Sequence, residues 1–198
     1  MLTNRVVFCG NSDVGKTSII KKIYSTEIPQ FHIPTDICTR SVCEMMLPDG
    51  SQTALNIWDL SGDRRYEREL KFYFKNVDVV VFVFDCTSQN SYDELYTWIS
   101  MANRNDAMTK ATYVVLANKI EDEQKRKVLS SQAQSYASMQ RAEYIEVSAL
   151  SGKGLDEFYI RLGELCKQKQ QQRLDDIKNQ PLHQSLTELD EPKPSKCC

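Results

Sequence analysis

The stretch Gly10–Thr17 reads G-N-S-D-V-G-K-T and matches the pattern GxxxxGK[ST]. It follows the apolar run Arg5–Cys9 and opens a helical pattern over residues 16–25, the context that this motif requires. Its glycines let successive backbone N–H groups face phosphate oxygens, and the helix dipole favours an anion. Lys16 is predicted to reach the β- and γ-phosphates, and the Thr17 hydroxyl to ligate Mg²⁺. A chance match is expected on the order of once in a hundred random chains.

Five further β-rich runs alternate with helical patterns along the chain. They are Thr39–Leu47, Thr53–Trp58, Val77–Phe84, Thr112–Ala117 and Glu143–Val147. The turn signal P-D-G-S at residues 48–51 joins the first two into a hairpin. Apolar spacing predicts helices over residues 92–99 and 155–165, with a weaker candidate at 131–140. This alternation predicts an α/β fold: a mostly parallel six-stranded sheet with one antiparallel edge hairpin and helices on both faces.

The composition narrows the class of protein. The chain of 198 residues is long enough for one domain, and its net charge of -2 gives no electrostatic case for a nucleic-acid partner. Seven cysteines without metal-ligand spacing are typical of reduced thiols in the cytosol. The longest apolar run, Val79–Phe84, is far shorter than the roughly 20 residues of a membrane span. We therefore expect a cytosolic globular domain.

Three more polar stretches follow predicted strands. In D-L-S-G, Asp59 can hold Mg²⁺ through water, and the N–H of Gly62 can approach a γ-phosphate because no Cβ intervenes. In A-N-K-I-E, the Glu121 carboxylate can accept two N–H groups from guanine, with the Lys119 stem over the ring. The backbone of S-A-L at residues 148–150 can meet the guanine oxygen. Taken alone, each stretch is more often an ordinary turn or polar loop than a site, and the preceding G-N-S-D-V-G-K-T motif reverses that preference for D-L-S-G and N-K-I-E.

The ordered set of motifs resembles the Ras superfamily of small GTPases. The motifs are G-N-S-D-V-G-K-T, P-T, W-D-L-S-G, N-K-I-E and E-V-S-A-L. The segment D-C-T-S-Q-N-S-Y-D-E-L-Y-T-W-I at residues 85–99 is similar to that family's fourth strand and following helix. The resemblance covers about Arg5 to Cys166. The polar tail ending in S-K-C-C, without a Rho-type insertion after Glu121, is most similar to the Rab branch.

The resemblance implies a P-loop small-GTPase domain and a set of site residues. The implied catalytic residues are Lys16, Thr35, Gly62 and Asp63, and the implied Mg²⁺ ligands are Thr17, Thr35 and Asp59. The implied GTP- and GDP-binding residues are Ser12, Asp13, Val14, Gly15, Lys16, Thr17, Ser18, Thr35, Gly62, Asn118, Lys119, Glu121, Ser148, Ala149 and Leu150. Thr35 is then the switch threonine, so both switch loops order around a γ-phosphate and relax after hydrolysis.

Asp63 departs from the family's pattern, where a glutamine usually orients the attacking water. An ionised aspartate only accepts hydrogen bonds and adds negative charge beside the phosphates. We therefore predict slow intrinsic hydrolysis, in a class whose unaided rate is only about 10⁻⁴ per second. Two interpretations remain: Arg64 and Arg65 draw the carboxylate away from the phosphates, or Asp63 is a solvated loop residue.

Three smaller departures concern the nucleotide. Ser12 stands where the family's glycine leaves room for the transition state, a frequent exchange among Rab proteins. Asp13 adds an anion to the phosphate loop and is expected to point to solvent. Glu121 replaces the family's aspartate, and its extra methylene must fold back to make the same contact with guanine.

The tail is interpreted separately from the domain. We expect a GTPase domain over residues 1–166 and a flexible tail over 167–198, because the tail contains no aromatic residue and cannot bury a core. In Rab proteins both terminal cysteines are geranylgeranylated, which assigns that role to Cys197 and Cys198. Since one lipid gives only reversible binding, two are what stable anchoring requires. An ordinary pair of exposed thiols is the alternative.

Two functions remain open from the sequence. The first is a monomeric GTP-hydrolysing switch in vesicle traffic that cycles between the cytoplasm and the cytoplasmic face of membranes. Its implied partners are an exchange factor, a GTPase-activating protein, effectors, the prenylation machinery and a GDI-type chaperone. The second is a pseudo-GTPase, a lipidated and GTP-loaded binding module without useful turnover. A P-loop kinase or ATPase is disfavoured by N-K-I-E.

Overall fold

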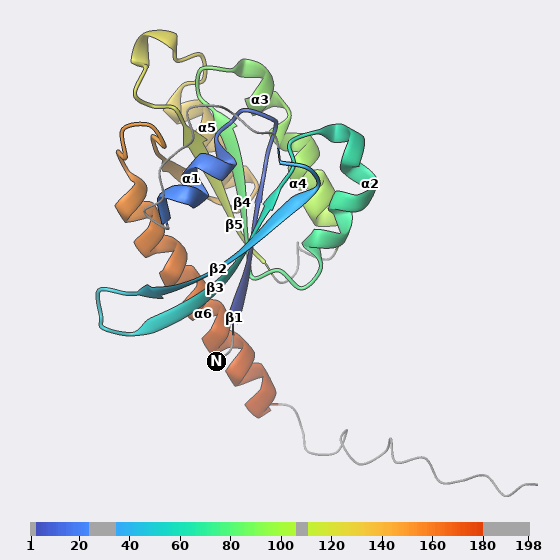
Figure 1. Cartoon of the computed structure of the whole chain (residues 1–198), viewed down its shortest axis with the longest axis vertical. Helices are drawn as coiled ribbons and strands as arrows, with labels where there is room; N and C mark the ends of the chain where they lie inside the picture. The colour runs from blue at the N-terminus through green and yellow to red at the C-terminus, as the bar shows by residue number, and fades with distance from the viewer. Residues whose placement is uncertain (1–2, 24–34, 106–110, 180–198) are drawn as a thin grey trace, which may run out of the picture.

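The computed structural model describes residues 3–23, 35–105 and 111–179. Within them, one sheet has the strand order β2-β3-β1-β4-β5-β6 (Figure 1). The strands are β1 Thr3–Cys9, β2 Cys38–Met46, β3 Gln52–Leu60, β4 Val79–Asp85, β5 Thr112–Asn118 and β6 Glu143–Glu146. Strand β2 is antiparallel to β3, and the remaining neighbours pair in parallel. The predicted six-stranded sheet with an antiparallel edge hairpin is confirmed.

Helices fill the connections between the strands. The α-helices are α1 Lys16–Ile23, α2 Glu67–Leu70, α3 Gln89–Asp93, α4 Leu95–Arg104, α5 Ser130–Met139 and α6 Leu155–Asn179. Short 3₁₀ helices occur at η1 Arg64–Tyr66, η2 Lys71–Phe74 and η3 Glu123–Lys125. The helix predicted over residues 92–99 is divided at Glu94 into α3 and α4. Ser88 caps α3, because its side chain accepts from the N–H of Ser91.

The sheet is covered on both faces, as predicted. Successive residues of a strand point to opposite faces, so Val7 and Phe8 enter different core clusters. The cluster that contains Val7 takes apolar side chains from α4 and α5, and the cluster that contains Phe8 takes them from α1 and α6. Phe8 meets Phe158 of α6 edge to face, with ring centroids 6.2 Å apart. Figure 1 shows α6 lying along this second face.

Helix α6 continues past the expected domain boundary at Cys166 and ends at Asn179. Lys167 pairs with Asp49 of the β2–β3 turn at 2.5 Å. Arg173 forms an ion pair with Asp78 and donates to Asn4 Oδ1 at 2.9 Å. Asp78 also accepts from the N–H of Arg5 at 2.7 Å, so one carboxylate ties α6 to the first strand. The helical part of the chain therefore reaches further than the composition suggested.

The rest of the tail, with Cys197 and Cys198, lies outside the described residues, and the division at residue 166 stays a prediction. Among the helices that the structure describes, none combines the length and the apolar character that crossing a membrane demands.

The loops that follow β1, β3, β4, β5 and β6 all leave from one edge of the sheet, because parallel strands end at the same edge. The predicted site residues gather at this edge.

Candidate functional site

The loop between β1 and α1 curls tightly and depends on its glycines. Gly10 and Gly15 have φ values of 141° and 95°, a region that side chains rarely adopt. A Cβ at Gly10 would lie 2.1 Å from the carbonyl oxygen of Val83, and one at Gly15 would lie 2.2 Å from Asn118 Nδ2. Asp13 is also left-handed, at φ 64°, and is exposed as expected. The predicted phosphate-binding loop therefore has the required backbone shape.

Lys16 lies beneath this loop and is only 6% exposed. Its Nζ donates to the carbonyl oxygens of Gly10 and Asn11, each at 2.8 Å. Burial lowers the pKa of Lys16 to about 8, and the nearby carboxylate of Asp59 opposes that shift. The loop thus holds a desolvated cation at its centre.

The three predicted metal ligands lie together. Thr17 Oγ1 donates to Asp59 Oδ2 at 2.5 Å and lies 3.2 Å from Thr35 Oγ1. The other carboxylate oxygen of Asp59 is buried and has no hydrogen-bond partner within the described part of the chain. Burial raises the pKa of Asp59, and the Thr17 hydrogen bond counters it. Two hydroxyls and an unsatisfied carboxylate oxygen form the hard oxygen set that Mg²⁺ prefers, so the residues present fit this ion.

Gly62 touches the phosphate-binding loop directly. A Cβ at Gly62 would lie 2.1 Å from the backbone nitrogen of Ser12 and 2.3 Å from the carbonyl carbon of Asn11. Both neighbours are backbone atoms, so no side-chain movement could make room. This close approach explains why the D-L-S-G stretch ends in glycine.

The Asp63 carboxylate is held by Arg65. It accepts from the backbone N–H of Arg65 at 2.9 Å and from the guanidinium Nε and Nη2 at 2.8 and 2.5 Å. These hydrogen bonds lower the pKa of Asp63, which therefore stays ionised. Arg64 instead pairs with Glu94 at 2.5 Å. Of the two interpretations offered by the sequence, the structure favours a carboxylate held by an arginine, and only Arg65 holds it among the described residues.

Asn118 connects two other predicted segments. Its Nδ2 donates to the carbonyl oxygen of Val14 at 2.8 Å, and its Oδ1 accepts from the N–H of Ala149 at 2.9 Å. The residue is 1% exposed. Sequence reasoning assigned Asn118 to the nucleotide, and the structure adds a role as a link between the phosphate loop and the S-A-L segment.

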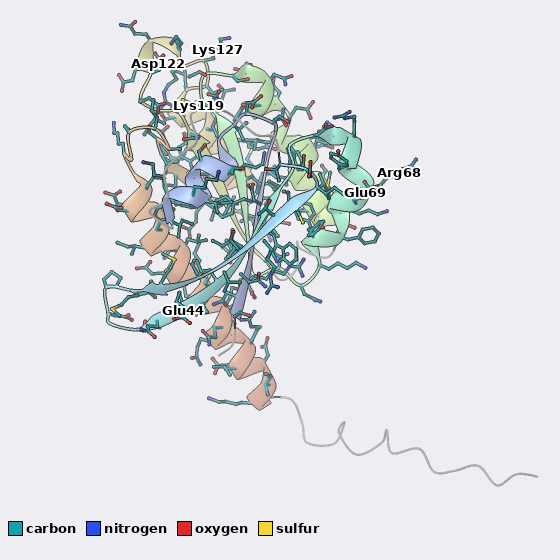
Figure 2. The ribbon with its side chains drawn as sticks, in the orientation of Figure 1. Glu44, Arg68, Glu69, Lys119, Asp122 and Lys127 are labelled. Carbon is teal, nitrogen blue, oxygen red and sulfur yellow. The ribbon has the colours of Figure 1, made fainter. Side chains whose placement is uncertain are left out.

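Lys119 follows β5 with a φ of 68°, and its Nζ pairs with Asp85 Oδ2 at 2.8 Å. Burial would raise the pKa of Asp85, but hydrogen bonds from Lys119 and Thr87 outweigh it and the pKa is lowered. Figure 2 labels Lys119 at this edge of the sheet, with Asp122 and Lys127 further out. Sequence reasoning assigned no role to Asp85. Its position is comparable to that of Asp59, because Asp85 is the last residue of β4 and Asp59 is the second-last residue of β3.

The remaining predicted residues lie around this centre. Ser12 is exposed, Val14 is buried and Ser18 is half-buried in the first turn of α1. Ser148 and Ala149 are buried, whereas Glu121 and Leu150 are exposed. The structure does not bring the Glu121 side chain into the buried cluster, and its contact with a base stays a prediction.

Sequence comparisons agree with this arrangement. The profile of the Ras family matches residues 5–168. Ras-related protein Rab-15 of Bos taurus is 30% identical over 188 residues, which cover 94% of this chain and 88% of that protein. Ras-related protein RabJ of Dictyostelium discoideum is 29% identical over 181 residues, covering 87% and 70%. Ras-related protein Rab-21 of Mus musculus is 27% identical over 163 residues, covering 82% and 71%. The profile spans every site residue described above.

Proposed function

Because the chain belongs to the Ras family and is a divergent, Rab-like small GTPase, we propose that it is a GTP-binding switch with slow intrinsic hydrolysis that acts in membrane trafficking by recruiting effectors. The observation that carries the proposal is the joint placement of Lys16, Thr17 and Asp59 around one loop. A buried cation and an oxygen cluster side by side suit a phosphate chain together with its metal ion.

Each residue has a defined part in binding. Backbone N–H groups of residues 10–17 face the phosphates, and the Lys16 ammonium, which uses two donors on carbonyls, has a third for a phosphate oxygen. Thr17, Thr35 and Asp59 would hold Mg²⁺, which when bound would neutralise charge that develops on the phosphate oxygens. Gly62 lies directly against the backbone of the same loop. Asn118 keeps the base-binding loops in register with the phosphate loop.

Slow turnover follows from the environment of Asp63. Its carboxylate cannot donate to a phosphoryl oxygen, and three hydrogen bonds from Arg65 hold that carboxylate in place. A GTPase-activating protein that supplies an arginine and a glutamine in trans would restore hydrolysis. The same observation favours the alternative function, a GTP-loaded binding module without useful turnover.

The remaining parts of the proposal concern partners and membrane. We expect an exchange factor, effectors, the prenylation machinery and a GDI-type chaperone as partners, as for Rab proteins in general. Two lipids on Cys197 and Cys198 would anchor the protein on the cytoplasmic face of a membrane. A Cys197→Ser/Cys198→Ser variant that stayed bound to vesicles would contradict this anchor.

The proposed function is tested by the nucleotide that the purified protein carries. We expect a guanine nucleotide at about one equivalent, retained in Mg²⁺ and released at least about tenfold faster after chelation, because the Thr17–Asp59 cluster loses its ion. Chromatography of the released nucleotide identifies it. GDP indicates a complete cycle, and GTP indicates the stalled alternative. If the purified protein carries no nucleotide and calorimetry detects no uptake of guanosine or adenosine polyphosphates, both the switch and the GTP-loaded binding module are contradicted.

An Asp63→Gln variant is expected to hydrolyse GTP about tenfold faster than wild type in a single turnover. Glutamine can accept from water and donate to the phosphoryl group, and it removes one negative charge. Rapid-quench measurement of phosphate release from preloaded protein gives both rates. The matched control is Asp122→Gln, because Asp122 caps η3 through Lys125 much as Asp63 caps η1 through Arg65. Equal rates for Asp63→Gln and wild type would refute the assignment of slow turnover to Asp63.

A further inference from the structure

Helix α4 contacts both of the loops that meet at Gly62. Trp98 Nε1 donates to Asn11 Oδ1 of the phosphate-binding loop at 2.8 Å. Glu94, four residues earlier and at the start of α4, accepts from Arg64 just after Gly62 at 2.5 Å. Residues four apart lie on one face of a helix, so the two contacts come from the same side of α4. Figure 1 shows α4 beside strand β4.

The two contacts differ in strength. Glu94 and Arg64 have side-chain exposures of 31% and 47%, so their ion pair is screened by water. Trp98 is 1% exposed, and its indole is packed in the core cluster with Phe82 and Phe84. A buried N–H is costly to leave without an acceptor. The hydrogen bond to Asn11 is therefore the firmer contact.

Asn11 is a meeting point of three elements. Its side chain accepts from Trp98, and its carbonyl oxygen accepts from Lys16 Nζ at 2.8 Å. Its carbonyl carbon and oxygen lie 2.3 and 2.6 Å from the Cβ position at Gly62. Movement of Asn11 would therefore change how Gly62 fits against the loop. Binding of a γ-phosphate requires Gly62 to lie against the loop. GDP lacks the γ-phosphate, so its binding does not depend on the position of Gly62.

We propose that Trp98 and Asn11 are positioning residues: their hydrogen bond fixes the phosphate-binding loop against Gly62, and so favours GTP over GDP. The proposal rests on the proposed function, since it concerns the same nucleotide. Asn11 occupies an x position of the GxxxxGK[ST] pattern, and Trp98 lies outside that pattern. The motif itself therefore assigns no role to either residue.

The test compares affinities for GDP and for a non-hydrolysable GTP analogue, measured by calorimetry on nucleotide-free full-length protein. Trp98→Phe removes the donor but keeps a ring, and Asn11→Leu removes the acceptor while leaving Trp98 intact. Each is expected to weaken binding of the GTP analogue about tenfold while changing GDP affinity less than about threefold. The double variant is expected to lose no more than either single one, because both remove one interaction. Asn11→Asp, which keeps an acceptor for the indole N–H, is expected to discriminate between the two nucleotides more strongly than Asn11→Leu does.

Tyr113→Phe is the control for a purely structural effect. It removes another hydrogen bond of α4, from the Tyr113 hydroxyl to Asn103 at 2.8 Å, away from the loop. It is expected to lower stability without changing the ratio of the two affinities. Equal discrimination by wild type, Trp98→Phe and Asn11→Leu would overturn the inference alone, as would parallel losses for both nucleotides. A wild-type protein that binds neither nucleotide would overturn the proposed function and this inference with it.

Discussion

A Lys16→Met variant is expected to bind GDP at least about 100-fold more weakly than wild type, which corresponds to about 2.7 kcal/mol. Lys16 is 6% exposed and donates to two carbonyl oxygens of its own loop. Methionine fills the same space without the charge, so it leaves both carbonyls unpaired and removes a cation from the phosphate site. Removing one member of a buried charge pair typically costs about 2–5 kcal/mol. Isothermal calorimetry with Mg²⁺ and GDP measures the change.

The matched control is Lys22→Met, the same substitution on the same helix at a half-buried position. It is expected to bind GDP as wild type does, within about twofold, because it lies more than a turn of helix beyond Lys16. If Lys16→Met also kept wild-type affinity, the loop between β1 and α1 would not be the phosphate site.

An Asn118→Leu variant is expected to lose both stability and nucleotide affinity. Leucine has nearly the same shape but leaves the carbonyl oxygen of Val14 and the N–H of Ala149 without their partner. Each unsatisfied buried group costs about 1–3 kcal/mol. We expect unfolding free energy to fall by at least about 2 kcal/mol in denaturant titrations, and GDP affinity to fall at least about tenfold.

Asn103→Leu separates the two effects. Asn103 accepts a hydrogen bond from Tyr113 in a part of α4 that does not contact the loops, so this variant is expected to lose stability alone. If Asn118→Leu were destabilised yet bound GDP normally, the link between the two loops would be structural only.

Much of the fold could be predicted because its signals are local. The pattern G-N-S-D-V-G-K-T fixes a strand, a loop and a helix within a short stretch, and P-D-G-S fixes the hairpin. Parallel strands place their following loops at one edge, so Thr17 and Asp59 could be expected to lie close together, whereas the role of Thr35 beside them was implied by the family resemblance. In the structure the hydroxyl oxygen of Thr17 lies within hydrogen-bonding distance of oxygens of both Thr35 and Asp59, and the assignment of the three as Mg²⁺ ligands stays a prediction.

Other features depend on contacts that no local pattern records. Trp98 and Asn11 are 87 positions apart in sequence, and the apolar spacing over residues 92–99 predicted a helix but no contact with the phosphate-binding loop. The choice of Arg65 over Arg64 as the partner of Asp63 depends on where Glu94 stands. Such pairings follow from the tertiary fold and could not be read from either segment alone.

The length of α6 was underestimated for a different reason. A tail without aromatic residues was expected to be flexible, but Gln, Lys, Arg and Leu all favour a helix. Gln171 donates to Asp175 one turn later at 2.9 Å, and Arg173 is fixed to Asp78. Helix propensity and two polar contacts therefore extend the helix where no hydrophobic core does.

The contact of α6 with the first strand bears on the order in which the chain acquires its fold during synthesis. Strand β1 is translated before the other five strands of the sheet, yet it lies between β3 and β4, and Phe8 is covered by Phe158. Both the sheet partners and the cover of this strand must be translated before it can be buried. The nascent chain thus carries an apolar strand that lacks part of its cover until Phe158 has been translated, and chaperones have that interval in which to bind it.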